Sequence, residues 1–282
     1  MKAAAIQEPA SDTSFLQRHS VVAYFCLAFA LSWAGALSVA LPSIVRGVAI
    51  SKTTGALMFP AMLVGPSVSG ILLTHIRHGK AGLRELLSRM RRVRVPARWY
   101  STLLIPPLLI LGVLWFLTIF EGRAFAPNTF YIGAAFGVIA GFFEEIGWMG
   151  FAFPELRRRC SAIVSAVLLG ALWTLWHLPV VNYLGTATPH GEYWLRYFLA
   201  FAAVMVPMRI LIAWLYTNTE SVLFCQLMHA SSTASLVVLS PVNVGAAQEA
   251  NWYFTYAGAL WIMVAVVAAI YGRSLTLPTR LN

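Results

Sequence analysis

Long apolar stretches recur along this chain, and they constrain its fold more than any other feature. Each stretch is close to the roughly 20 residues that an α-helix needs to cross the hydrocarbon core of a bilayer. We predict transmembrane helices at residues 21–41, 57–75, 100–120, 130–152, 162–181, 194–216, 221–240 and 253–271. Only 11% of the residues are charged, too few for a soluble domain of this length. The predicted fold class is therefore an all-α membrane protein, a bundle of about eight transmembrane helices.

The basic residues are distributed unevenly between the two ends of these helices. One end carries the arginine-rich segment 76–98, the triplet Arg157–Arg159, and the residues Arg273 and Arg280. The other end carries only Arg46, Lys52, Arg123 and Arg196. Because cytoplasmic loops of membrane proteins are enriched in Lys and Arg, we predict that both termini are cytoplasmic. The chain is then an integral multi-pass protein of a bacterial cytoplasmic membrane.

The domain organisation is simple, since the sequence has no internal repeat and no soluble domain. We predict a cytoplasmic N-terminal segment at 1–20, a single polytopic membrane domain at 21–272, and a cytoplasmic tail at 273–282. Segment 76–98 reads as an amphipathic helix that contacts anionic lipids, with Leu83, Leu86, Leu87 and Met90 on its apolar face. Substrate docking is its alternative role. The basic residues flank apolar stretches, a pattern of topology signals that argues against nucleic-acid binding despite the net charge of +10.

Two adjacent acids, Glu144 and Glu145, lie in a stretch that is otherwise uncharged from residue 130 to 153. An ionised carboxylate at membrane depth costs several kcal/mol, so such residues are retained where a partner, a proton or a cavity compensates. Neighbouring residues of a helix point about 100° apart, and therefore one carboxylate can face a cavity while the other faces a structural partner. The alternative is a protonated or hydrogen-bonded pair that only holds the bundle together.

Two histidines in other apolar stretches complete a polar set. Trp173 lies one turn before His177 and can stack on it, and Pro179 ends or bends that helix. Thr233 lies one turn after His229. Taken singly, each histidine reads as a hydrogen-bonded core residue, but two acids and two histidines from three helices suggest a convergent site. A carboxylate can deprotonate water, and histidines can orient that water, donate to an oxyanion or bind a metal.

Three motifs carry a family resemblance: Glu144-Glu145-Ile-Gly-Trp-Met-Gly-Phe, Trp173-Thr-Leu-Trp-His177-Leu-Pro and Met228-His229-Ala-Ser-Ser-Thr233. In this order they resemble the motifs of the CAAX-protease and bacteriocin-processing (CPBP) family, which includes the eukaryotic type II CAAX prenyl endopeptidase. The resemblance runs from about residue 21 to 240, with its core at about 130–240. It implies a helical bundle whose intramembrane polar cavity opens to the cytoplasmic side. It also implies an endopeptidase that cuts membrane-embedded or lipid-anchored peptides and proteins.

The resemblance assigns roles to five residues. Glu144 is the expected base that activates water, Glu145 its support, and His177, His229 and Thr233 the groups that orient the water and stabilise the oxyanion. The family is described as either glutamate-dependent or zinc-dependent. Two histidines and one glutamate are a common catalytic zinc set, so Zn²⁺ held by His177, His229 and Glu144 stays open as a cofactor, although the chain has no HExxH motif.

Two positions depart from the family pattern. Met149 stands where the first motif has arginine, which leaves Glu145 without its expected counter-charge unless another span supplies one. Thr233 stands where the third motif has asparagine, and a hydroxyl lacks the paired donor and acceptor of an amide. These departures keep two alternatives open. One is a non-catalytic membrane scaffold or bacteriocin-immunity protein that binds peptide or lipid, and the other is a proton-coupled transporter.

Overall fold

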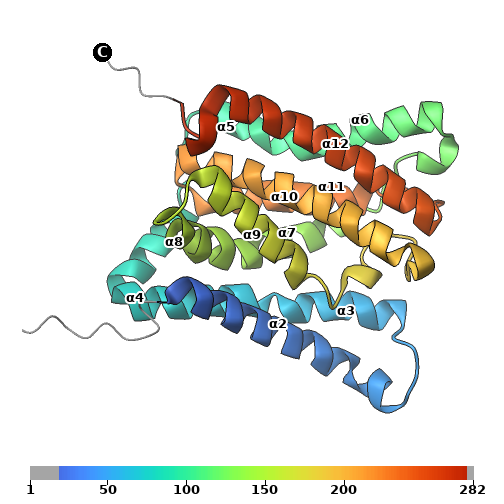
Figure 1. Ribbon diagram of the computed structural model, residues 1–282, viewed down its shortest axis with the longest axis horizontal. Helices are drawn as coiled ribbons and strands as arrows, with labels where there is room; N and C mark the ends of the chain where they lie inside the picture. Colours follow the sequence, from blue (N-terminus) through green and yellow to red (C-terminus); the bar gives the residue numbers. More distant parts are fainter. Residues whose placement is uncertain (1–18, 278–282) are drawn as a thin grey trace, which may run out of the picture.

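The computed structural model describes residues 19–277, and within this range the chain is all-helical, with no β-strand. Figure 1 shows the long helices side by side as one bundle. The helices are α2 (Ser20–Val45), α3 (Lys52–Met62), α4 (Val64–Met90), α5 (Arg98–Ser101), α6 (Ile105–Phe120), α7 (Gly133–Gly147), α8 (Phe153–Arg157), α9 (Ala162–Trp176), α10 (Trp194–Thr219), α11 (Val222–Leu239) and α12 (Ala246–Tyr271). The predicted N-terminal segment lies outside the described residues except for its last two, and so does the end of the predicted tail.

The predicted fold class is confirmed. Over the described residues, seven helical stretches are long and apolar enough to cross a membrane, and α9 is a shorter apolar helix of 15 residues. The predicted helix at 162–181 is therefore too long at its C-terminal end. The chain leaves the helix at His177, two residues before Pro179, because a proline disfavours helical geometry in the residue before it.

The predicted amphipathic helix at 76–98 corresponds to the second part of α4, which follows a kink at Gly79 and is shorter than predicted. Gly79 has φ +60° and ψ −156°, a non-helical backbone geometry that separates α4 into two helical parts. The helix then ends at Met90, and residues 91–97 are irregular; Pro96 within them disfavours helical geometry at the residue before it. On its expected apolar face Leu86 is buried, whereas Leu87 is exposed.

Glycines bring α7 close to its neighbours. A Cβ atom added to Gly137 or Gly141 would collide with the backbone of α11 at residues 226–234, and one added to Gly147 would collide with Pro66 of α4. Small residues let membrane helices approach this closely. Two side chains then fix α7 between these helices: Ser67 donates to the carbonyl of Phe143, and Gln226 donates to the carbonyl of Phe142.

The two ends of the bundle differ. The first described residues, the last ones, the α4–α5 connection and the α8–α9 connection all lie at one end (Figure 1). We call this the termini end. The connections at residues 46–51, 121–132, 177–193 and 240–245 lie at the opposite end, which we call the loop end.

Candidate active site

Glu144 lies near the end of α7, just before a π-helical turn at Trp148–Ala152. The side chain is fully buried, and two indoles donate to the same carboxylate oxygen: Trp173 Nε1 at 2.7 Å and Trp148 Nε1 at 3.1 Å from Oε2. The other oxygen, Oε1, has no hydrogen-bond partner among the described residues. Glu144 also lines a cavity, and Oε1 is its carboxylate oxygen that no protein donor occupies.

Glu145 is fully buried and is held by charge. Arg209 of α10 places Nη1 2.8 Å from each of its two carboxylate oxygens, and His229 of α11 places Nδ1 2.7 Å from Oε1. The guanidinium of Arg209 also lies 4.1 Å from the ring centre of Trp173, a cation–π contact. Arg209 therefore supplies the counter-charge that Met149 cannot. Hydrogen bonds between ionised groups are the strong ones, so this cluster holds His229 in a defined orientation.

His177 follows the last residue of α9, where backbone carbonyls have lost their helical partners. Its Nδ1 lies 2.8 Å from the carbonyl oxygen of Trp173. Since a carbonyl only accepts, Nδ1 carries the proton, and the neutral ring presents Nε2 as an acceptor. The predicted stacking on Trp173 is wrong in its geometry, because the two rings meet at 64°, edge to face. Phe59 and Phe201 complete an aromatic enclosure around His177.

His229, like His177, is oriented by a hydrogen bond from its Nδ1. A carboxylate accepts, so Nδ1 donates to Glu145 and Nε2 is the nitrogen left for other partners. The ring also meets Trp173 edge to face, with centres 5.0 Å apart. Thr233 lies one turn further along α11 and lines the same cavity as Glu144, His177 and His229. The structure thus brings four of the five predicted site residues to the cavity wall and places Glu145 behind His229.

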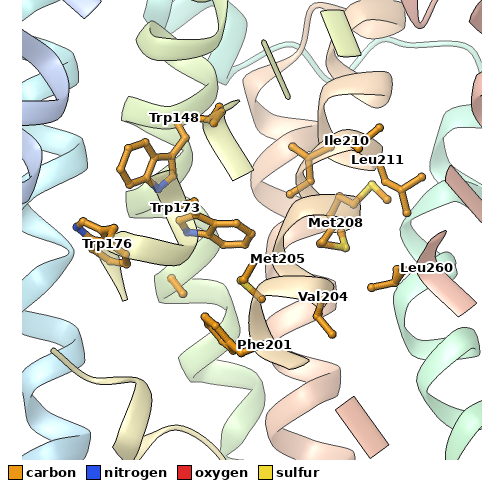
Figure 2. Close-up of a cluster of buried hydrophobic side chains, with 14 of the residues drawn as sticks. Trp148, Trp173, Trp176, Phe201, Val204, Met205, Met208, Ile210, Leu211 and Leu260 are labelled. Atoms are coloured by element: carbon orange, nitrogen blue, oxygen red, sulfur yellow. The ribbon is translucent and has the colours of Figure 1, made fainter. Parts of the chain in front are cut away.

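Three indoles gather beside these residues. Figure 2 shows Trp148, Trp173 and Trp176 close together, with Met205 and Phe201 of α10 facing Trp173. Sequence reasoning missed the donor role of Trp148 and Trp173 and the pairing of Arg209. The signals were present: Trp148 shares a helix face with Glu144, and Arg209 is the single Lys or Arg deep inside its apolar stretch.

The cavity holds about 360 Å³ and is mostly apolar. Its inner part is lined by Phe59, Phe136, Glu144, Trp173, His177, Phe201, Met205, His229, Ser232 and Thr233. Its outer part is lined by Asn128, Phe130, Leu184, Gly185, Thr186, Ser240 and Val242, which belong to three connections of the loop end. The cavity therefore extends toward the end opposite the termini. The sequence predicts that the termini are cytoplasmic and also that the cavity opens to the cytoplasm. Because the cavity extends toward the end opposite the termini, these two predictions cannot both hold.

The three side chains predicted to hold zinc share one cavity. Glu144, His177 and His229 all line the cavity. Among residues 19–277, however, no three His, Cys, Asp or Glu side chains are grouped so that they could hold a metal ion. The side chains as arranged do not form a metal-binding group, and zinc at this site stays a prediction from the sequence.

Comparison with known proteins finds the same family as the motifs. Residues 126–235 match the family described as type II CAAX prenyl endopeptidase, Rce1-like. A protein of Methanococcus maripaludis named CAAX prenyl protease 2 is 26% identical over 189 residues, which cover 61% of this chain and 68% of that protein. The matched family region contains Glu144, Glu145, His177, His229 and Thr233. Both findings support the resemblance predicted from the sequence.

Proposed function

On the premise of this similarity to the CPBP family, we propose that the chain is an intramembrane endopeptidase. It hydrolyses a peptide bond of a membrane-associated peptide or protein inside the cavity, with water activated by Glu144. The family findings support a protease, and the motifs say nothing about a prenyl group on the substrate. The observation that carries the proposal is that Glu144, which has one carboxylate oxygen without a partner, lines the cavity together with both histidines.

In the proposed reaction, Glu144 Oε1 takes a proton from a water molecule while His177 Nε2 accepts the other hydrogen and orients it. The water oxygen attacks the carbonyl carbon of the scissile bond, and the C=O electrons move to the oxygen. His229, carrying a proton on each ring nitrogen, donates from Nε2 to this oxyanion. Glu144 then passes its proton to the leaving nitrogen, the oxyanion electrons re-form the C=O bond, and the C–N bond breaks to release a carboxylic acid and an amine. A positioned general base of this kind contributes about 10²–10⁴-fold to a rate.

Substitution of Glu144 tests the proposal. Glu144→Gln keeps the size and the acceptor oxygen but cannot take a proton. We expect new termini of membrane proteins in cells that carry the wild-type chain and none in cells that carry Glu144→Gln at equal expression. Glu121→Gln, at an exposed acid, is the matched control and leaves the termini unchanged. Termini that persist with Glu144→Gln would exclude Glu144 as the base.

A non-catalytic scaffold or immunity protein is the second candidate, favoured by Thr233 in place of the family asparagine. The other departure, Met149, weighs less because Arg209 offsets the missing charge. A scaffold predicts that Glu144→Gln retains the cellular phenotype of the wild-type chain, whereas a protease predicts its loss. The strains with the wild-type chain and with Glu144→Gln therefore distinguish a protease from a scaffold.

A further inference from the structure

The cavity and the basic residues lie at opposite ends of the molecule, and this bears on where the substrate enters. Among residues 19–277 the termini end carries twelve Lys and Arg: Arg77, Lys80, Arg84, Arg89, Arg91, Arg92, Arg94, Arg98, Arg157, Arg158, Arg159 and Arg273. The loop end carries four: Arg46, Lys52, Arg123 and Arg196. Since Lys and Arg mark the cytoplasmic side, the loop end faces away from the cytoplasm.

The lining of the cavity indicates what can enter it. Within the described residues the lining contains no Lys, Arg or Asp, and Glu144 is its single acid. The walls above Glu144 are aromatic and aliphatic, including Phe136, Phe201 and Leu236. A charged side chain moved into such walls loses its hydration without gaining a partner, whereas an apolar one is stabilised by burial. The site therefore selects against charge near the scissile bond.

The rim of the cavity indicates the route of entry. Phe130 and Val242 line the outer cavity and are 51% and 56% exposed, and the neighbouring Tyr131 and Ile132 are 75% and 77% exposed. Exposed aromatic and aliphatic residues at the end of a membrane helix are typical of the lipid–water interface. A substrate that reaches this rim thus comes from the membrane surface.

We infer that the cavity is loaded from the extracytoplasmic face, by an uncharged apolar peptide segment that lies in the outer leaflet. This inference rests on the proposed function for its chemistry, but the side and the selectivity of binding are measured without proteolysis. It also resolves the conflict between the two sequence predictions: the termini are cytoplasmic and the opening is not.

Cysteine labelling tests the side of entry. The background replaces Cys26 and Cys160 and keeps Cys225, which is buried. Val242→Cys and Asn128→Cys mark the rim, and Arg91→Cys marks the termini end. We expect a membrane-impermeant maleimide to label both rim positions in right-side-out vesicles and Arg91→Cys only in inverted ones. Labelling of the rim only in inverted vesicles would overturn the inference.

Protection by a peptide tests the class of substrate, in the Glu144→Gln background so that nothing is cut. The probe is a capped peptide of Leu, Ala and Phe, and its control carries one Lys in the middle. At ten times its Kd, the apolar peptide should slow labelling of Leu236→Cys about ten-fold, and the control should not. Equal protection by both, or by neither, overturns the substrate class. If protection holds while the Glu144 protein cuts nothing, the proposed function fails and the entry side stands.

Discussion

At the scale of single residues, two neighbouring acids have different surroundings. Glu144 lines the cavity, accepts from two neutral indoles and has one oxygen without a partner, whereas Glu145 is paired with Arg209 and His229. The 100° between successive helical residues makes this division possible, because one side chain reaches α9 and the cavity while the other reaches α10 and α11. An acid that already holds a guanidinium and an imidazole is suited to orientation, and an acid with a free oxygen is suited to proton transfer.

Trp173 and Trp176 provide a matched pair for testing the role of Glu144. Both are buried indoles of α9 next to His177, but only Trp173 donates to Glu144, and Trp176 Nε1 has no partner among the described residues. A hydrogen bond to a charged group contributes about 1.5–3 kcal/mol, so Trp173→Phe should lower kcat by about 10- to 100-fold. Trp176→Phe should leave kcat nearly unchanged. Cleavage of a fluorogenic peptide by the purified variants measures both, and equal losses would contradict a specific role for Trp173.

Arg209 should be essential for stability because it neutralises a fully buried carboxylate. Removing one partner of a buried ion pair costs about 3–5 kcal/mol, so Arg209→Met should lower the midpoint of thermal unfolding markedly. Adding Glu145→Gln should restore most of the loss, because no uncompensated charge remains and Gln still accepts from His229. Unfolding in detergent, followed by intrinsic fluorescence, measures this double-mutant cycle. A fully stable Arg209→Met protein would show that the pair is not needed.

The sequence predicts which residues form the site better than it predicts their contacts. Glu144, Glu145, His177 and His229 stand out because ionisable groups are rare in apolar helices. Their partners are harder to identify, since Arg209 reaches Glu145 across 64 positions of the chain and Trp173 reaches Glu144 across 29. Such contacts depend on how α9 and α10 pack against α7, and periodicity along one helix carries no information about that packing.

At the scale of helices, the site depends on how closely α7 and α11 approach, since α7 carries both acids and α11 carries His229. Gly141 permits this approach, because an added Cβ would lie 2.6 Å from the backbone nitrogen of Ala230. Backbone atoms cannot move aside cheaply, so Gly141→Ala should destabilise the protein by about 1–3 kcal/mol and lower activity. Gly112→Ala is the control, since its Cβ would meet open space and alanine favours the helix. Thermal unfolding and peptide cleavage measure the stability and the activity of both variants. Equal stability and activity of the two variants would contradict the role of Gly141.

Helix existence is predicted well here and helix ends are not. Hydropathy identifies each apolar stretch because bilayer thickness imposes a minimum length. It does not show that α3 and α4 divide at Leu63, that α4 is kinked at Gly79, or that α9 ends at Trp176. These boundaries depend on local backbone geometry at glycine and proline. They also depend on His177, whose ring donates a hydrogen bond to a backbone carbonyl at the end of α9.

At the scale of the whole molecule, the two ends of the bundle differ in charge and in structure. One end carries most of the basic residues and an ion-pair cluster around Glu155, with Arg77 and Arg158. The other end carries the outer cavity and connections held by hydrogen bonds: Asn128 N–H donates to the carbonyl of Leu239 at the end of α11, and Thr186 donates to the carbonyl of Pro241 in the next connection. The chemistry proposed here requires this second end to keep its shape, because its connections form the outer wall of the cavity.

Glu249 of α12 is the residue that ties this outer wall together. Its buried carboxylate accepts from the backbone N–H groups of Thr186 at 2.7 Å and Ala187 at 2.9 Å, and lies 3.3 Å from Nε2 of the buried His190. Glu249→Ala leaves these donors without an acceptor, and an unsatisfied buried donor costs about 1–3 kcal/mol. We therefore expect faster hydrogen exchange at 184–190 and 240–245, together with faster maleimide labelling of Leu236→Cys behind them.

Glu85→Ala is the control for this change at the whole-molecule scale. Glu85 also pairs with a cation, Arg89 at 3.6 Å, but its side chain is 61% exposed, and exposed ion pairs contribute at most about 1 kcal/mol. Its substitution should leave exchange at the loop end unchanged. If Glu249→Ala also left exchange and labelling unchanged, the outer wall would be held by packing alone. The cavity would then keep its shape without Glu249, and substrate entry would not depend on this carboxylate.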